Sequence, residues 1–228
     1  MLTLQLTQDG YEFRALRRTE PVQQGWDVYA LQTALIAQQI EVGPLDATLG
    51  DKTATAIWRY QQREDLVEDG IAGTATQRDL ALLFSRQQSG LFDLPHRMLY
   101  GQIERESGFL LGNQSPMRAG GGADCGVAQR NSEHTPPLAG FDVPGSILEL
   151  ARNAATHFTK FNEAGVATRR AWELAAGSWN APAYASWLAG IRDTTAAQPS
   201  SAAEATLEAY IQNVTCYVRW EKEKEVKA

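Results

Sequence analysis

Cysteine and histidine are scarce in this sequence of 228 residues, which contains two cysteines and three histidines. Cys125 and Cys216 are too few for the disulfide framework that stabilises small secreted domains, and they are consistent with one bridge or with two free thiols. The histidines, His96, His134 and His157, show neither HExxH nor any comparable spacing. The sequence therefore lacks a motif for a catalytic zinc ion, and we expect no bound metal.

Basic residues and long apolar runs are also few. The chain has 21 Lys and Arg against 27 Asp and Glu, a net charge of -6, whereas nucleic-acid binding requires clustered positive charge. No apolar run approaches the roughly 20 residues that span a bilayer, and the first ten residues lack the basic and apolar regions of a signal peptide. Because 43% of the residues are hydrophobic, we expect a packed globular protein with no nucleic-acid partner, no membrane insertion and no signal peptide.

The N-terminal part of the chain predicts a β-hairpin followed by helices. Leucines alternate with polar residues at positions 2, 4 and 6 before a turn at Asp9-Gly10. Apolar residues between positions 28 and 36 then recur at helical spacing. Two further segments repeat with a period of 23 residues, each with an aspartate, a glycine turn and a threonine before an apolar helix: Asp46, Gly50, Thr53 and Ile57 correspond to Asp69, Gly73, Thr76 and Leu80.

Residues 26–82 carry a more specific pattern than a generic helical bundle. The pattern comprises Leu31-Gln32, a Gly-x-x-Thr turn, Tyr60-Gln61 and Asp69-Gly70-Ile71. It resembles the three-helix peptidoglycan-binding domain family. The resemblance implies a wall-binding domain, and the repeated residues explain its fold better than they identify the side chains that hold the ligand.

The second half of the chain is expected to begin after a polar segment at residues 85–90, which places a domain boundary there. A helix should begin near Pro95 and end at Gly112. Glu104 lies about 140° from Leu99 around this helix and should be solvated. The apolar stripe of the helix contains Leu99, Ile103, Glu106 and Leu110.

Glu106 is therefore a carboxylate on an apolar face, and this placement has two explanations. It could pair with a buried arginine as a structural ion pair, or it could line a cleft as a general acid. Desolvation raises the pKa of a carboxyl group, which suits proton donation near neutral pH.

Further helices are expected towards the C-terminus. An apolar stripe between residues 147 and 161 ends at Gly165, and Arg169-Arg170 reads as the solvated start of a helix that carries Trp172 and Ala176. In the last helix one face contains Leu207, Tyr210, Val214 and Tyr217, so that Tyr210 should point inwards.

Four motifs in this half occur in a fixed order. They are Glu106-Ser107, then Gly126-Val127-Ala128-Gln129, then Ala176-Gly177-Ser178-Trp179-Asn180-Ala181, and finally Tyr210-Ile211. In this order, over residues 95–220, the chain resembles the lysozyme-like catalytic domain of soluble lytic transglycosylases and goose-type lysozymes. That family has Glu-Ser, Gly-Leu-Met-Gln, Ala-Tyr-Asn-Ala-Gly and Tyr-Val in these places.

The resemblance implies a role for each matching residue. Glu106 would be the catalytic acid, Ser107 would help to orient it, Gln129 and Asn180 would contact the sugar, and Tyr210 would lie close to the carboxyl group. The inner motifs depart from the family, because Val127-Ala128 replaces Leu-Met, Trp179 replaces Tyr and Pro182 replaces Gly. The outer motifs are the closer match.

Taken together, the fold class is mainly α: a small three-helix peptidoglycan-binding domain with an N-terminal β-hairpin, residues 1–86, followed by a lysozyme-like, mostly helical catalytic domain, residues 90–228. This architecture is similar to that of modular phage endolysins. The resemblance implies a monomer, made in the host bacterial cytoplasm, that reaches the cell wall through a separate membrane protein and needs no cofactor.

Glycan strands of peptidoglycan are the expected partner, and the bond between N-acetylmuramic acid and N-acetylglucosamine is the expected target. A lytic transglycosylase would form 1,6-anhydro-muramic acid, whereas a lysozyme would hydrolyse the same bond with the help of a second carboxylate. Goose-type lysozymes offer an acid two residues after the motif glutamine, where this chain has Asn131. This favours the transglycosylase, with Asp124 and Glu133 as the other carboxylates nearby in sequence.

Three other functions remain as alternatives. Asp124-Cys125-Gly126 is similar to the Asp-Cys-Ser-Gly of cell-wall cysteine peptidases, although the serine is missing and His157 falls in a helical pattern. A zinc amidase is a second alternative, but the sequence lacks the zinc ligands that it would need. A non-catalytic wall-binding protein would have no need of Glu106.

Overall fold

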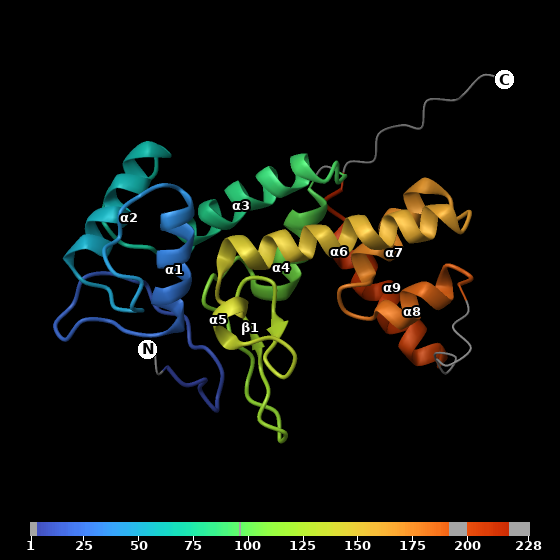
Figure 1. Ribbon diagram of the computed structural model, residues 1–228, viewed down its shortest axis with the longest axis horizontal. Coiled ribbons are helices and arrows are strands. Elements are labelled where there is room, and N and C mark those ends of the chain that lie inside the picture. Colours follow the sequence, from blue (N-terminus) through green and yellow to red (C-terminus); the bar gives the residue numbers. More distant parts are fainter. Residues whose placement is uncertain (1–3, 96, 192–199, 219–228) are drawn as a thin grey trace. The chain divides into compact units, whose positions relative to one another are not determined.

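The computed structural model describes residues 4–95, 97–191 and 200–218. Within these residues the protein is mainly helical, which confirms the prediction of a mainly α protein (Figure 1). The helices are α1 (Trp26–Ala37), α2 (Asp51–Arg63), α3 (Thr74–Leu91), α4 (Met98–Ser107), α5 (Pro137–Gly140), α6 (Val143–Glu163), α7 (Thr168–Gly177), α8 (Pro182–Leu188) and α9 (Ser201–Thr215). Strands β1 (Asp124–Cys125) and β2 (Arg130–Asn131) pair antiparallel. None of the described helices is both long and apolar enough to cross a membrane.

The chain forms two compact units that do not follow one another in sequence. The first contains residues 1–85 and 106–148, and the second contains residues 86–105 and 149–228. The division expected from the sequence, at residues 86–90, coincides with the first change of unit. Residues 106–148, however, belong to the same unit as the N-terminal residues. Their backbone and side chains form hydrogen bonds with residues 1–85.

The N-terminal segment does not form the predicted hairpin in its described part, residues 4–25. The chain turns at residues 8 and 9 as expected, but residues on both sides of the turn bond to other parts of the first unit, Thr7 among them through Gln114. Tyr11 N–H donates to the Gln114 carbonyl at 2.9 Å, and Leu16 forms a bridge with Ala72. The hairpin prediction was wrong because these partners satisfy the backbone groups that a second strand would have satisfied. Position 2 of the predicted hairpin lies outside the described residues.

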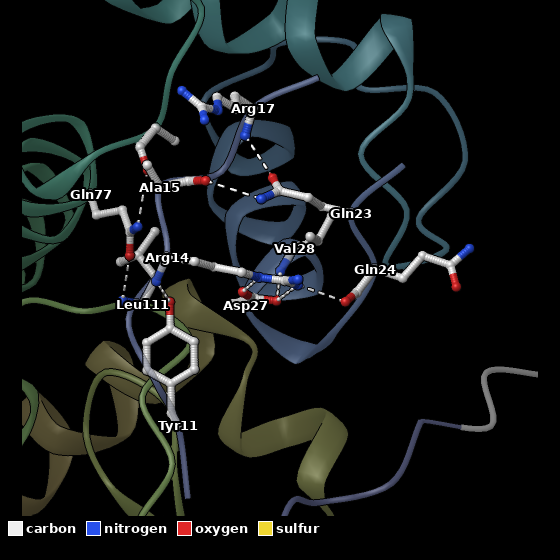
Figure 2. Close-up of polar contacts among 11 residues, drawn as sticks. Tyr11, Arg14, Ala15, Arg17, Gln23, Gln24, Asp27, Val28, Gln77 and Leu111 are labelled. Carbon is white, nitrogen blue, oxygen red and sulfur yellow. Dashed lines mark hydrogen bonds and ion pairs between the residues drawn. The ribbon is translucent and has the colours of Figure 1, made fainter. Parts of the chain in front are cut away.

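An ion pair between Arg14 and Asp27 connects the N-terminal segment to the start of α1. Arg14 Nε donates to Asp27 Oδ2 at 2.7 Å and Arg14 Nη2 to Asp27 Oδ1 at 2.9 Å, while Nη2 also reaches the Gln24 carbonyl (Figure 2). Asp27 is 4% exposed. Gln23 accepts from Arg17 N–H and donates to the Ala15 carbonyl. A buried carboxylate is costly unless it is paired and hydrogen-bonded, and Arg14 supplies that pairing.

The core of the first unit consists of the inner faces of α1, α2 and α3 together with residues 141–143. Trp26 stacks on Phe141 with ring centroids 5.0 Å apart, and Thr33 Oγ1 accepts from Val143 N–H at 3.3 Å. Burial of the apolar faces at helical spacing is the main stabilising contribution. The fully buried side chains of the three helices include Val28, Leu31, Leu35, Ile57, Tyr60 and Leu80.

Two helix ends differ from the sequence prediction. The polar segment at residues 85–90 is the last part of α3, which continues to Leu91. A single glycine costs a helix only about 1 kcal/mol, so Gly90 does not end it. Helix α4 ends at Ser107 and not at Gly112, because Gly108 and Phe109 both have left-handed backbone angles, with φ of 60° and 67°.

In the second unit, α7 packs against α9 (Figure 1). A Cβ atom on Gly177 would lie 2.8 Å from the Ile211 side chain, so the glycine allows the close approach. The stripes expected on α6 and α9 are buried at Ile147, Leu150, Ala154, Phe161, Leu207, Tyr210 and Val214, whereas Phe158 of the α6 stripe is only half-buried. The same prediction was wrong for Tyr217, which lies beyond the end of α9 and is 37% exposed.

Candidate functional site

The repeated residues of the N-terminal domain form two equivalent hydrogen-bonded clusters. Gln32, at the centre of α1, donates within 3.2 Å to Asp46 Oδ1 and Thr53 Oγ1, and its Oε1 accepts from Ala47 N–H at 2.9 Å. Both Gln32 and Thr53 are buried. The side chain therefore ties the loop after α1 to the first turn of α2.

Gln61 does the same one repeat later. Its Nε2 donates to Asp69 Oδ1 at 2.8 Å and to Thr76 Oγ1 at 3.2 Å, and its Oε1 accepts from Gly70 N–H at 2.8 Å. Two hydrogen bonds lower the pKa of Asp69, from Ile71 N–H first and from Gln61 second. The glutamine, aspartate and threonine of each repeat thus shape the loops, in agreement with the interpretation that these residues explain the fold.

Replacing Gln61 by leucine is expected to destabilise the first unit by about 2 kcal/mol, because it removes the hydrogen bonds that Gln61 forms with the Gly70 N–H, the Asp69 carboxylate and the Thr76 hydroxyl. Gln62→Leu provides the matched control, since Gln62 is the exposed neighbour, and it should change stability by less than about 0.5 kcal/mol. Urea unfolding followed by circular dichroism measures both. Equal losses in the two variants would show that the cluster around Gln61 contributes no stability.

Glu106 and Ser107 are the last two residues of α4, and they belong to the first unit. Glu106 is half-buried and Ser107 is buried. The chain reverses immediately after them through Gly108 and Phe109, and Leu110 N–H donates to the Ser107 carbonyl at 3.1 Å. A positive φ at a residue as bulky as phenylalanine is rare and persists only where surrounding contacts impose it.

Those contacts come from α3 and α1, as Figure 2 shows for Gln77 and Leu111. The Arg78 guanidinium lies 4.9 Å from the centre of the Phe109 ring, and Gln77 Oε1 accepts from Leu111 N–H at 3.2 Å. A Cβ atom on Gly112 would lie 2.3 Å from Asp27 Cα, so this glycine, expected to cap a helix, instead permits close packing on α1. The segment after Glu106 is therefore held by α1 and α3.

Gln129 lies in the turn between β1 and β2, in the same unit as Glu106. It has a positive φ of 51°, and its Nε2 donates to the Gly126 carbonyl at 2.9 Å and to the Asn113 carbonyl at 3.3 Å. A Cβ atom on Gly126 would lie 1.9 Å from the Gly140 carbonyl oxygen, so glycine is required there. The motif thus forms a tight turn that fixes the Gln129 side chain.

Of the two carboxylates near this turn, Asp124 is held in an ion pair. Asp124 Oδ2 accepts from Arg118 Nη2 at 2.5 Å. Asn131 Oδ1 accepts from Glu133 N–H at 2.8 Å, so Asn131 shapes the loop and supplies no acid.

Asn180 and Tyr210 belong to the second unit. Asn180 is exposed at the turn after α7, where its N–H donates to the Gly177 carbonyl at 3.1 Å. Tyr210 points inwards from α9 and is 7% exposed, as predicted. The five predicted site residues are thus distributed over both units, with Glu106, Ser107 and Gln129 in the first.

The structure corrects the prediction for Glu104, which is half-buried and not solvated. The Tyr217 hydroxyl donates a hydrogen bond to its carboxylate, and this bond is the main reason that the pKa of Tyr217 rises to about 12. The other carboxylate oxygen, Oε2, is buried without a hydrogen-bond partner. The Tyr100 ring lies 4.9 Å from the Tyr217 ring. The helical pattern around Glu104 could not predict its contact with Tyr217, because Tyr217 lies 113 residues away in sequence.

Both cysteines are free thiols, so of the two alternatives left open by the sequence, the structure has no disulfide bridge between them. Cys125 is fully buried, and burial raises the pKa of its thiol to about 11. A nucleophilic cysteine needs a lowered pKa, so this environment argues against the peptidase alternative. His157 is half-buried beside Phe161, and burial lowers its pKa. No group of three or more His, Cys, Asp or Glu side chains in the described parts of the chain could hold a metal ion.

Comparison with known protein families identifies the N-terminal part of the chain. Residues 24–80 match the peptidoglycan binding domain family, nearly the range expected from the sequence. This stretch contains α1, α2 and both glutamine clusters. A search of curated proteins finds no match to the chain. The protein therefore carries a peptidoglycan-binding domain, which supports binding to the bacterial cell wall.

Proposed function

We propose that this protein binds peptidoglycan through residues 24–80 and cleaves its glycan strands with Glu106 as the catalytic acid. The observation that carries the proposal is the ordered set of motifs from Glu106-Ser107 to Tyr210-Ile211. The environment of Glu106 supports it, because a half-buried carboxyl group at the end of a helix, with a fixed chain reversal behind it, is suited to positioned proton transfer.

The reaction would begin with proton donation from Glu106 to the oxygen that links N-acetylmuramic acid to N-acetylglucosamine. The bond from the anomeric carbon to this oxygen breaks as positive charge develops on the sugar ring. In the transglycosylase route the muramyl 6-hydroxyl oxygen then attacks the anomeric carbon and returns its proton to Glu106. The product is a 1,6-anhydro ring, and neither a metal nor a cofactor takes part.

The lysozyme route needs a second carboxylate to activate water, and the loop around β1 and β2 offers little for that role. Asn131 occupies the position where goose-type lysozymes have an acid, and its amide oxygen accepts a hydrogen bond from the backbone N–H of Glu133. Asp124 is paired with Arg118. These contacts favour the transglycosylase over the hydrolase.

The products distinguish the two routes. Digestion of purified sacculi is expected to release muropeptides that end in 1,6-anhydro-muramic acid, lighter by one water than hydrolysed ends. Mass spectrometry of the released material measures this difference directly. Reducing muramic-acid ends would show a lysozyme, and Asp124→Asn and Glu133→Gln would then identify its base. A protein that binds sacculi and releases nothing would be a non-catalytic wall binder.

We also propose that the protein acts as a phage endolysin. A wall-binding domain combined with glycan cleavage in one compact chain is suited to lysis from within. Under this proposal the protein is made in the host cytoplasm and is released to the wall through a separate membrane protein. Its expected monomeric state stays a prediction.

A further inference from the structure

Gln77 on α3 is a buried side chain with a hydrogen bond at each end of its amide group. It is 1% exposed. Its Nε2 donates to the Ala72 carbonyl at 3.1 Å, and its Oε1 accepts from Leu111 N–H at 3.2 Å (Figure 2). Leu111 is as deeply buried as Gln77. One side chain thus joins the loop before α3 to the segment that follows Glu106.

Gln77 differs in this respect from the glutamines of the two repeat clusters. The bonds of Gln32 and Gln61 to the aspartate and threonine of each repeat end within residues 24–80, the range that matches the peptidoglycan binding domain family. Gln77 belongs to the same range, but its partner Leu111 lies 34 positions further along the chain. The fold of the binding domain alone therefore does not account for this contact.

The contact holds a chain reversal that begins directly after Glu106 and Ser107. Gly108 and Phe109 both have left-handed backbone angles, and Leu110 N–H donates to the Ser107 carbonyl at 3.1 Å. A left-handed conformation at phenylalanine is strained and persists only where other contacts impose it. Without such contacts the reversal would relax, and the last turn of α4, which carries Glu106, would fray.

The contacts that impose the reversal come from two neighbouring residues of α3. The Arg78 guanidinium lies 4.9 Å from the centre of the Phe109 ring, and Phe109 is 3% exposed. Gln77 satisfies the buried N–H of Leu111. A buried N–H without a partner is costly, so loss of the Gln77 amide would force the segment to move.

We infer that Gln77 is a positioning residue for Glu106. A general acid acts only when its carboxyl group lies within hydrogen-bond reach of the leaving oxygen, and a misplacement of about 1 Å can lower the rate roughly 10²-fold. By fixing the reversal, Gln77 holds the end of α4 from which Glu106 is presented. The inference rests on the proposed function, since it takes Glu106 as the acid. It gives the wall-binding domain a part in cleavage as well as in binding.

Gln77→Met is the variant that tests this role, because methionine keeps the length of the side chain but has no amide group. On soluble, uncross-linked glycan strands, the variant should show a kcat about tenfold lower with KM within about twofold. Co-sedimentation with sacculi should be unchanged. An unaltered kcat in the folded variant would overturn the inference, as would a loss that appears only in KM.

Thr33→Val is the matched control. Thr33 is also buried, and its Oγ1 accepts from Val143 N–H at 3.3 Å, so it joins α1 to residues 106–148 away from the reversal. Valine has the same shape and removes this bond. The control should lose stability but keep kcat within about twofold. Equal losses of kcat in the two variants would show a general loosening of the first unit and would overturn the positioning role.

Amide hydrogen exchange of the same proteins locates the cause. Residues 108–111 should exchange about tenfold faster in Gln77→Met and at an unchanged rate in Thr33→Val. A lower kcat without faster exchange in this segment would overturn the inference. If Gln77→Met does not fold, Arg78→Met decides, because Arg78 is exposed and contacts the same reversal through Phe109. A lower kcat in that variant supports the inference, and an unchanged kcat overturns it.

This inference and the proposed function fail in different ways. An unaltered protein that releases no fragments from glycan strands would contradict the proposed function, and the inference with it. An unaltered protein that cleaves the strands, together with a folded Gln77→Met variant of equal kcat, would contradict the inference alone.

Discussion

Glu106→Gln is expected to abolish release of muropeptides from sacculi, with a loss of at least about 10²- to 10⁴-fold, the contribution of a positioned general acid. The amide keeps the shape of the side chain but cannot donate the proton that the leaving oxygen requires. Chromatography with mass spectrometry of digested sacculi measures the rate. Co-sedimentation with the same sacculi should be unchanged, because residues 24–80 carry the binding domain.

Glu104→Gln is the matched control for this variant. Glu104 is on the same helix, two residues earlier, and its amide would still accept the hydrogen bond from Tyr217. Activity should stay within about twofold of the unaltered protein, since the variant removes no catalytic group. Equal losses at the two positions, or full activity in Glu106→Gln, would contradict the assignment of the acid.

Gly101→Ala is expected to lower the free energy of unfolding by about 2–3 kcal/mol, because a small core position is overfilled. A Cβ atom at residue 101 would lie 1.8 Å from the carbonyl oxygen of Val214, a backbone atom of α9 that cannot rotate away. Helix α4 would have to move from α9. Thermal unfolding followed by circular dichroism should show a midpoint lower by roughly 5–10 °C.

Gly90→Ala tests whether this loss is specific to the packing of α4 on α9. Gly90 is also helical and belongs to the same unit, but no atom lies within 4 Å of a Cβ added there. Alanine should stabilise α3 slightly, by about 0.5 kcal/mol. A Gly101→Ala protein as stable as Gly90→Ala would mean that the two helices are not in this close contact.

The sequence predicted the helices well because their apolar spacing is local information. The stripe from residue 147 to 161 appears in α6 and ends at Gly165, and Tyr210 is buried on α9. The repeated aspartate and threonine also proved structural, since in each repeat both bond to one buried glutamine, Gln32 or Gln61.

The errors arose where a distant segment supplied the partner. Leu16 pairs with Ala72 and not with its neighbours, so no hairpin forms. Gly112 packs on Asp27 and does not end a helix, and Tyr217 covers Glu104. A local sequence pattern cannot predict these contacts, because the two partners lie far apart in the sequence. For the candidate site, the ordered motifs identified five residues, and their roles in catalysis stay predictions.

The bonds between Thr7 and Gln114 join residues that are 107 positions apart, and Thr33 meets Phe141 across 108 positions. During synthesis on the ribosome, the wall-binding repeat therefore leaves the exit tunnel long before the residues that complete its packing. Closure of so long a loop has an entropic cost that later contacts must offset. Until residues 106–148 have emerged, parts of the repeat lack their contacts. Gln77 lacks its hydrogen bond with Leu111, and Trp26 lacks the Phe141 ring on which it stacks. The first unit thus completes its packing only once residues 106–148 have been made, and a version cut at residue 86 would lack these contacts.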